Sequence, residues 1–399
     1  MATTTNFLNE AMELEDYLVR IRRKIHRNPE LAFKEKATAA LIADELKRAG
    51  IRVETKVGGT GVVGILEGSR PGDTVALRAD MDALPLQELS GEEFASKSEG
   101  VMHACGHDSH IAMLLGAARI LATNTASLRG TVKFLFQPAE EAAERGGGAA
   151  PMIKAGVLEN PKVDHVFGLH ILSNYPSGSF ALRPGPIMAA SGTFKIRILG
   201  RGGHGSAPHE TVDPIFVASE VVSALQGIRS RMMDPVQPSV VSICSIHSGT
   251  RNNIIPDEAF LEGTMRTLNE GSAKKVASLI TRIARSTCRT FGARCEVDIE
   301  QAYPVTVNDA ATTAEVARVL RSIPGTKTME VPPLLIAEDF SFFLREVPGT
   351  YYFLGTRNER KGCVYPNHSS KFKIDEGVLK YGAASLALLA FEFSGKEKR

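Results

Sequence analysis

Apolar and polar residues follow two different spacings along the chain, and the spacings separate helices from strands. Apolar residues recur every three or four positions in three segments, which predicts helices over residues 6–27, 36–48 and 111–122. Short apolar runs bounded by Gly, Pro and Asp predict buried strands instead, at residues 61–66, 74–78, 131–136, 163–169 and 350–354. Strands that alternate with helices predict an α/β fold, in which a mixed sheet is flanked by helices.

The pattern changes between residues 192 and 302. Strand-like and helix-like segments follow one another there in the order strand, helix, strand, strand, helix, strand, at residues 193–199, 214–232, 239–247, 258–265, 273–291 and 293–300. This is the βαββαβ order of a ferredoxin-like unit. Because 399 residues exceed what one core usually holds, we predict a larger domain, residues 1–190 and 303–399, interrupted by a small one, residues 191–302.

Composition excludes several classes of protein. The chain carries 47 Lys and Arg against 45 Asp and Glu, so its net charge of +2 gives no electrostatic footprint for nucleic acid or an acidic membrane. Neither a signal peptide nor an apolar run of about 20 residues is present, so we expect a cytoplasmic protein without a membrane span. Five scattered cysteines do not suggest a disulfide framework.

The densest group of reactive side chains lies at residues 103–110. His103, Cys105, His107 and His110 can all bind a metal, and Asp108 adds a carboxylate within the same eight residues. This spacing predicts a metal or nucleophile site. Asp108 or Ser109 could alternatively cap the following helix, and one or two of the histidines could only support other ligands.

Two adjacent glutamates follow the predicted strand 131–136. Glu140 and Glu141 repel each other unless a cation or a proton separates them. A metal ion would resolve this conflict if one glutamate bound it and the other took a proton from water. Asp80, Asp82 and His170 also lie where predicted strands end, so we expect these groups to gather at one edge of the sheet, together with His368.

Eight motifs together resemble the aminoacylase and carboxypeptidase family of metallopeptidases, in its N-acyl-amino-acid amidohydrolase, or hippurate hydrolase-like, branch. They lie in the family's order at residues 78–85, 102–110, 137–141, 203–209, 253–257, 263–266, 337–343 and 366–372. Residues 204–211 and 354–359 are further similar to archaeal thermostable zinc carboxypeptidases.

The resemblance implies a role for each candidate residue. The larger domain would be catalytic and the inserted one a lid and dimerisation domain, giving a homodimer or higher homo-oligomer. Glu140 would be the general base, His204 would polarise the scissile carbonyl, and Asn253 and Arg266 would hold the substrate carboxylate. Two divalent metals per subunit, zinc first with cobalt or manganese as alternatives, would be bound by Cys105, His107, Glu141, His170 and His368, with Cys105 bridging the two.

The sequence therefore predicts a metal-dependent hydrolase that cleaves the amide next to a free carboxylate, in N-acyl amino acids or short peptides. Two alternatives stay open at this point. One is a thiol hydrolase with Cys105 as nucleophile, activated by His103 or His107. The other is a non-catalytic protein that binds a metal or a carboxylate.

Overall fold

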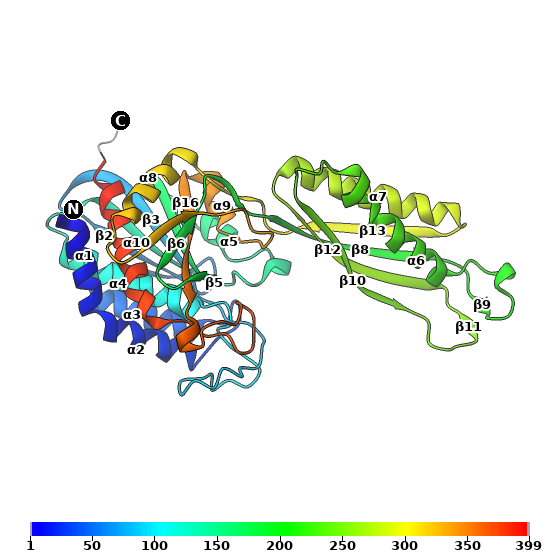
Figure 1. The fold of residues 1–399 in the computed structure, drawn as a ribbon, viewed down its shortest axis with the longest axis horizontal. Coiled ribbons are helices and arrows are strands. Elements are labelled where there is room, and N and C mark those ends of the chain that lie inside the picture. The colour runs from blue at the N-terminus through cyan, green and yellow to red at the C-terminus, as the bar shows by residue number, and fades with distance from the viewer. Residues whose placement is uncertain (1, 397–399) are drawn as a thin grey trace. The chain divides into compact units, whose positions relative to one another are not determined.

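The computed structural model describes residues 2–396, with side chains from Asn6 onward. The chain divides into two compact units (Figure 1). Unit 1 contains the residues up to Ile187, Val307–Pro332 and those from Asp339 onward. Unit 2 contains Met188–Thr306 together with Pro333–Glu338.

An eight-stranded mixed sheet forms the centre of unit 1. Its spatial order is β1-β2-β4-β3-β5-β16-β6-β15. The strands are β1 (Arg52–Val57), β2 (Gly61–Glu67), β3 (Arg70–Asp80), β4 (Arg129–Gln137), β5 (His165–Pro176), β6 (Ser179–Leu182), β15 (Lys327–Glu330) and β16 (Gly349–Arg357). The central neighbours β4, β3, β5 and β16 run parallel, whereas β1 and β2 pair antiparallel with their neighbours. The inner strands are buried along nearly their whole length, as in sheets covered on both faces.

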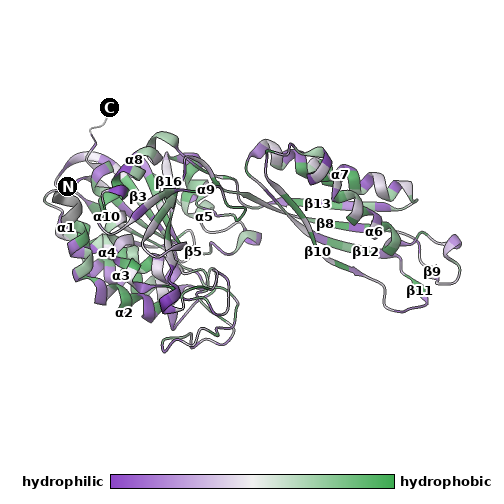
Figure 2. Ribbon diagram, viewed as in Figure 1, coloured by the Kyte–Doolittle hydropathy of each residue, from purple (hydrophilic) through white to green (hydrophobic). Residues whose placement is uncertain are grey.

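Helices cover this sheet (Figure 1). They are α1 (Ala2–Glu13), α2 (Glu15–His26), α3 (Lys36–Arg48), α4 (His107–Thr123), α5 (Ala149–Lys154), α8 (Ala310–Arg321), α9 (Ser341–Glu346) and α10 (Leu379–Ser394), with 3-10 turns at Ala143–Arg145, Glu359–Lys361 and Glu376–Val378. Helices α4 and α10 are buried almost all round and supply much of the core. Polar and apolar residues instead alternate along α2 and along α7 (Glu270–Thr290) of unit 2, as expected for helices with one face toward solvent (Figure 2).

One helix prediction is wrong. Residues 6–27 do not form a single helix, because the backbone of Leu14 leaves helical angles (φ −88°, ψ 3°) between α1 and α2. Hydrogen bonds continue past this point, from Leu14 N to Glu10 O and from Leu18 N to Leu14 O. The apolar residues therefore keep their helical spacing through the break, which is why the spacing predicted one helix. Glu15 and Asp16 provide the acidic first turn that favours the start of a new helix.

Unit 2 contains an antiparallel four-stranded sheet in the order β10-β12-β8-β13. Its elements follow the chain as β8 (Ala190–Leu199), α6 (Pro214–Leu225), β10 (Ser239–Ser248), β12 (Glu258–Thr267), α7 (Glu270–Thr290) and β13 (Arg294–Gln301). This confirms the predicted ferredoxin-like order. The helix predicted over 214–232 ends earlier, at Leu225, and a π-helical turn follows at Ile228–Met232.

Smaller elements complete the two units. Two-residue strands β9 (Gly203–His204) and β11 (Ile254–Ile255) pair with each other, a 3-10 turn follows at Pro208–Glu210, and β7 (Gly185–Met188) pairs with β14 (Thr306–Asn308). The stretch Pro333–Glu338, which we assigned to the larger domain, groups with unit 2. The hydrogen bond from Ala189 N to Ile336 O explains this grouping. None of the helices described has the length and apolarity needed to cross a bilayer.

Candidate metal centre and active site

Three neighbouring parallel strands bring polar side chains to one level of the larger sheet. In the strand register Asp80 of β3 lies opposite Gln137 of β4, and Arg78 lies opposite Gly168 of β5. Two residues further on, Asp80 and His170 each place one ligand atom within 4.8 Å of the other's. We expected His170 to follow the end of its strand, but β5 continues to Pro176. His170 nevertheless lies at the edge of the sheet where the other polar residues gather, because the neighbouring strands β3 and β4 end beside it.

The start of α4 supplies two further side chains. Gly106 has φ +96° and precedes His107, the first residue of the helix. A Cβ atom at Gly106 would lie 2.3 Å from Ile171 Cδ1, so only glycine allows this approach. The left-handed turn places Cys105 and His107 on either side of Gly106. Asp108 and Ser109 therefore do not cap the helix, and Asp108 instead pairs with Arg22 and His26 at 2.8 Å each.

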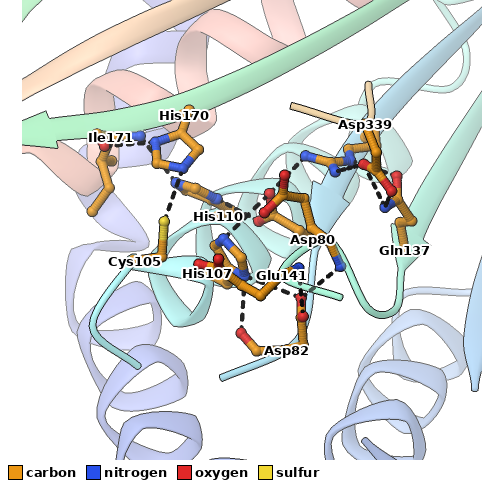
Figure 3. Close-up of polar contacts among 12 residues, drawn as sticks. Asp80, Asp82, Cys105, His107, His110, Gln137, Glu141, His170, Ile171 and Asp339 are labelled. Atoms are coloured by element: carbon orange, nitrogen blue, oxygen red, sulfur yellow. Dashed lines mark hydrogen bonds and ion pairs between the residues drawn. The ribbon is translucent and has the colours of Figure 1, made fainter. Parts of the chain in front are cut away.

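All five predicted metal ligands converge (Figure 3 shows four of them by name). Cys105 Sγ lies 3.3 Å from His170 Nε2 and 3.3 Å from His368 Nε2. His368 Nε2 also lies 3.1 Å from Glu141 Oε1. Cys105, His107 and Glu141 each place one ligand atom within 4.8 Å of the other two. The ligands come from four separate segments, which only the fold brings together.

Hydrogen bonds on the far side of two imidazole rings set which nitrogen faces the cluster. His107 Nδ1 donates to Asp82 O at 2.9 Å, and His170 Nδ1 donates to Ile171 O at 2.7 Å. The Nε2 atoms of both rings therefore face the cluster. His170 Nε2 lies 3.3 Å from Cys105 Sγ, and His107 Nε2 is buried without a hydrogen-bond partner, 3.6 Å from Asp80 Oδ2. A buried imidazole nitrogen without a hydrogen-bond partner, beside a thiol, a second imidazole and a carboxylate, is the arrangement that a metal ion satisfies, so these residues fit a metal.

Burial and charged neighbours shift the pKa values of the cluster. Burial lowers the pKa of the His107 imidazole, but Asp80 and Asp82 outweigh burial and raise that pKa to about 10. Burial raises the pKa of the Cys105 thiol well above its usual range, and the nearby Glu141, Glu140 and Asp80 carboxylates raise it further. Burial and the neighbouring His110 lower the pKa of His170, which keeps its imidazole neutral. Burial alone would raise the pKa of Glu141, but His368 and His107 lower it. A bound cation would favour the ionised thiol and carboxylate.

A buried network lies behind the ligands, and the sequence analysis did not find it. Asp80 accepts from Arg78 Nη1 at 2.6 Å and from His110 Nδ1, whose Nε2 in turn accepts from Ile171 N. Asp80 also groups with His107, His110 and His170 as a second set of potential ligands. Although burial raises the pKa of Asp80, His107, His110 and Arg78 outweigh it and hold that pKa well below its usual range. The strand-end position of Asp80 was the only signal in the sequence.

Arg78 links this network to a distant part of the chain. Its Nε donates to Gln137 Oε1 at 2.9 Å and its Nη2 to Asp339 Oδ1 at 2.8 Å. Asp339 also accepts from Gln137 Nε2 and from the backbone N–H groups of Gly148 and Ala149. The planar guanidinium thus joins two buried carboxylates and an amide, which a lysine could not do. Asp339 lies in motif 337–343, but nothing local to that motif indicates its partners.

Backbone geometry positions Glu140 and Glu141. Asp82 Oδ1 accepts from Glu140 N at 3.0 Å, and Asp82 Oδ2 accepts from Glu141 N at 2.9 Å. Ala139, which precedes them, has φ +57°, an uncommon conformation for a residue with a side chain. The turn after β4 is therefore constrained at three successive residues. The role of Asp82 was not recognised from the sequence.

The loop that carries His368 is constrained in a similar way. His368 has φ +66°, and its N–H donates to Ala104 O at 2.8 Å. The preceding Asn367 donates from Nδ2 to Cys105 O at 2.9 Å and to Ile171 O at 3.2 Å. This amide joins the segments of three predicted ligands, another role that the sequence does not reveal.

The predicted residues of the inserted unit do not all come together. His204 of β9 lies opposite Ile254, and Gly205 N donates to Asn253 O, so His204 and Asn253 are neighbours. Arg266 lies near the end of β12 opposite Ser191, whereas Glu258, which follows the β11 segment, begins the same strand. At about 3.3 Å per residue, the eight steps from Glu258 to Arg266 span roughly 26 Å. Within unit 2 of one chain, Asn253 and Arg266 cannot hold the same carboxylate.

Comparisons with known proteins agree with this geometry. Residues 76–392 match the model of peptidase family M20/M25/M40. The chain is 56% identical to Thermostable carboxypeptidase 2 of Saccharolobus solfataricus, over 97% of this chain and 98% of that protein. It is 39% identical to the hippurate hydrolase of Campylobacter jejuni, over 97% and 99%. The crystal structure of a dinuclear metal-binding peptidase of the M20 family from Bacillus subtilis superposes with a TM-score of 0.83 at 34% identity, covering 96% of this chain and 99% of that one.

The family match covers most of the chain, and the buried cluster supplies the metal-binding residues that a metallohydrolase needs. The chain therefore belongs to peptidase family M20/M25/M40 and is a hydrolase of its carboxypeptidase and amidohydrolase group.

Proposed function

We propose that this protein hydrolyses the amide bond next to a free carboxylate, in N-acyl amino acids or short peptides, with two divalent metals per subunit. The observation that carries the proposal is the meeting of Cys105 Sγ with the Nε2 atoms of His170 and His368, beside Glu141. The names of the carboxypeptidase and hippurate hydrolase relatives support the substrate class.

The donor set favours zinc, with cobalt or manganese as alternatives. A thiolate and imidazoles are softer ligands than calcium or magnesium prefer. Cys105, His107, Glu141, His170 and His368 would hold the metals, with Cys105 as the bridging ligand. When bound, such metals polarise the amide carbonyl and lower the pKa of water to about 7.

The remaining work falls to side chains of this protein. Glu140 follows the constrained Ala139, and Asp82 binds its N–H, so the backbone of Glu140 is fixed. Its carboxylate lies near enough to Cys105 to raise the pKa of that thiol. We assign Glu140 as the base that takes a proton from the attacking water and passes it to the leaving amine. His204 would polarise the carbonyl, while Arg266 and Asn253 would hold the substrate carboxylate. Burial lowers the pKa of Arg266, whose Nη1 donates to Met265 O at 2.9 Å and to Thr264 Oγ1.

The site disfavours Cys105 as a nucleophile. Reactive cysteines have lowered pKa values and positive surroundings. The thiol of Cys105 is instead buried among carboxylates that raise its pKa. A thiol mechanism would also leave the converging His170, His368 and Glu141 without a role.

The test compares hydrolysis of a benzoyl-amino acid and of a dipeptide with the same C-terminal residue. Each is assayed before EDTA, after EDTA, and after zinc, manganese or cobalt is restored. We expect activity to disappear with EDTA and to return with metal. Glu140→Gln should keep its metal content and lose nearly all turnover. Cleavage that ignores EDTA but stops on thiol alkylation would refute the metal mechanism, and near-normal kcat in Glu140→Gln would refute the assigned base.

We propose further that the protein is at least a homodimer through unit 2. Because Asn253 and Arg266 lie at opposite ends of unit 2, a shared carboxylate needs one of them from each of two copies. Unit 2 also exposes an apolar surface on α6, where Ile215 and Phe216 are each 48% exposed, next to the edge strand β10 with Ile246 51% exposed. Exposed apolar residues on a helix and on an edge strand of one unit form the kind of surface that a second copy of the chain would cover.

Mixed dimers test this arrangement. Glu140→Gln and His204→Ala should each be inactive alone. If His204 acts in the partner's active site, random mixing would restore about one quarter of wild-type activity, since half of the dimers carry one intact site of two. A monomer in light scattering, or no recovery after mixing, would contradict the proposal.

A cytoplasmic location is also a proposal. All five cysteines are free, as is usual in a reducing compartment. Cell fractionation with an antibody to the protein would test it.

A further inference from the structure

A buried glutamate outside the predicted site binds the turn that carries Glu140. Glu35 precedes α3 and is fully buried. Its Oε1 accepts from Ala139 N at 3.0 Å and from Phe33 N at 3.0 Å, and its Oε2 accepts from Thr60 Oγ1 at 2.5 Å. One carboxylate therefore joins the segment before α3, the start of β2 and the turn after β4.

The two backbone N–H groups that Glu35 binds share an unusual property. Phe33 has φ +61° and Ala139 has φ +57°, and each is a left-handed residue that is not glycine. Such residues persist only where the surrounding structure holds them. The Ala139 methyl group also packs in a small apolar cluster with Ala32, Ala142 and Phe33. Residues 32–35 thus hold Ala139 both by its N–H and by its side chain.

The conformation of Ala139 decides where Glu140 and Glu141 lie, because a change in one backbone angle swings every atom that follows it. Asp82 binds the N–H groups of Glu140 and Glu141, and Glu35 binds the N–H group just before them. Three successive backbone N–H groups of this turn, those of residues 139–141, therefore donate to two buried carboxylates, Glu35 and Asp82. A rigid support of this kind is what a precisely placed base and ligand require.

Glu35 has no competing role as a helix cap. Its side chain does not bind the first turn of α3. That role belongs to Glu30, whose carboxylate accepts from Ala37 N at 3.1 Å and Thr38 N at 2.8 Å. The neighbouring Glu30 therefore offers a matched control, since it stabilises the same segment without touching Ala139.

We propose that Glu35 is a positioning residue for Glu140 and Glu141, acting through the left-handed backbone of Ala139. The proposal rests on the roles given to these glutamates under the proposed function. Burial raises the pKa of Glu35, whereas the hydrogen bonds from Thr60 and Phe33 lower it. The acceptor geometry of Glu35, and not only its contribution to stability, then governs turnover.

The test compares Glu35→Ala, Glu35→Asp and Glu35→Gln with Glu30→Ala. Gln keeps an acceptor oxygen at the same reach, whereas Asp keeps the charge but is one methylene shorter. We expect Glu35→Ala and Glu35→Asp to lose about 10- to 100-fold in kcat with KM changed less than about threefold. Glu35→Gln should stay within about fivefold of wild type, because the acceptor matters more than the charge. Glu30→Ala should lower the melting temperature and keep kcat.

Two further measurements separate positioning from general stability. The rise in melting temperature on adding zinc should be smaller in Glu35→Asp than in wild type or Glu30→Ala, because Glu141 lies in the same turn. Ala139→Gly should restore part of the kcat lost in Glu35→Ala, since glycine adopts φ +57° without strain. If Glu35→Ala does not fold, the Asp and Gln variants still decide the matter.

The possible outcomes are distinct. Wild-type kcat and a wild-type zinc response in Glu35→Asp, while Glu140→Gln is inactive, would overturn the role of Glu35 alone. An active Glu140→Gln would overturn the proposed function instead. Equal losses of kcat in Glu30→Ala and Glu35→Ala would show that both glutamates act only through stability, and would also overturn the proposal.

Discussion

Replacing Asp82 by asparagine tests how the active-site turn is held. Asp82 is buried, and each of its oxygens accepts one backbone N–H, from Glu140 at 3.0 Å and from Glu141 at 2.9 Å. Asparagine has nearly the same shape but offers only one oxygen. Whichever way its amide is turned, an NH₂ group then faces one of the two backbone donors, and that donor loses its partner.

The size of the effect follows from these two contacts and from a third, in which Asp82 Oδ1 lies 3.3 Å from His107 Nδ1. A hydrogen bond to a charged group contributes about 1.5–3 kcal/mol, and a buried donor without a partner costs about 1–3 kcal/mol. We therefore expect Asp82→Asn to destabilise the protein by roughly 3 kcal/mol, which lowers the melting temperature by about 5 °C or more. If about 2 kcal/mol of this reaches the transition state through a displaced Glu140, kcat falls roughly 30-fold.

The assay combines kcat and KM for a benzoyl-amino acid with the melting temperature of the metal-loaded enzyme. Asp309→Asn is the matched control, because Asp309 caps α8 by accepting from Thr312 N at 2.8 Å and asparagine caps helices equally well. The control should keep both kcat and the melting temperature. If Asp82→Asn behaves like this control, the turn does not depend on the two-oxygen contact, and our account of it is wrong.

Three further predictions concern other parts of the protein. Arg266→Ala should raise KM about tenfold or more for substrates with a free carboxylate, because it removes a two-point contact to that anion. It should raise KM little for the corresponding amides. Equal increases of KM for acids and amides would exclude this role. Gly106→Ala should lower the free energy of unfolding by about 2 kcal/mol or more and remove most of the activity, because the new Cβ would lie 2.3 Å from Ile171 Cδ1. Thermal unfolding and kcat would show this. Wild-type values of both would contradict it. Burial raises the pKa of Glu376, but Arg23 and Arg22 lower it below the usual 4.5. The ionised Glu376 therefore stabilises the fold above pH 4.5. This stabilisation is lost as the pH falls through the lower pKa of the folded state. Glu376→Gln should accordingly lower the melting temperature at pH 7 by an amount that shrinks at acid pH, and a difference independent of pH would refute this.

Most of the elements and the candidate reactive groups could be predicted from the sequence alone. Helix and strand spacing depends on residues within one or two turns, so the order of elements in unit 2 could be predicted from local patterns. The side chains of residues 103–110 and the pair Glu140 and Glu141 indicate a metal or nucleophile site, and the eight motifs together indicate metal-dependent hydrolysis. Local spacing failed at Leu14, where the apolar periodicity continues through a change in backbone angles.

Which distant residues meet follows from the tertiary structure. The pairing of parallel strands brings His170, from the middle of a strand, close to Asp80. Arg78 meets Asp339 across 261 positions, and Glu35 meets Ala139 across 104. No local pattern encodes such contacts, because they follow from how strands pair and how loops pack over their ends. The sequence thus identifies the reactive groups, whereas the fold determines the residues that hold them in place.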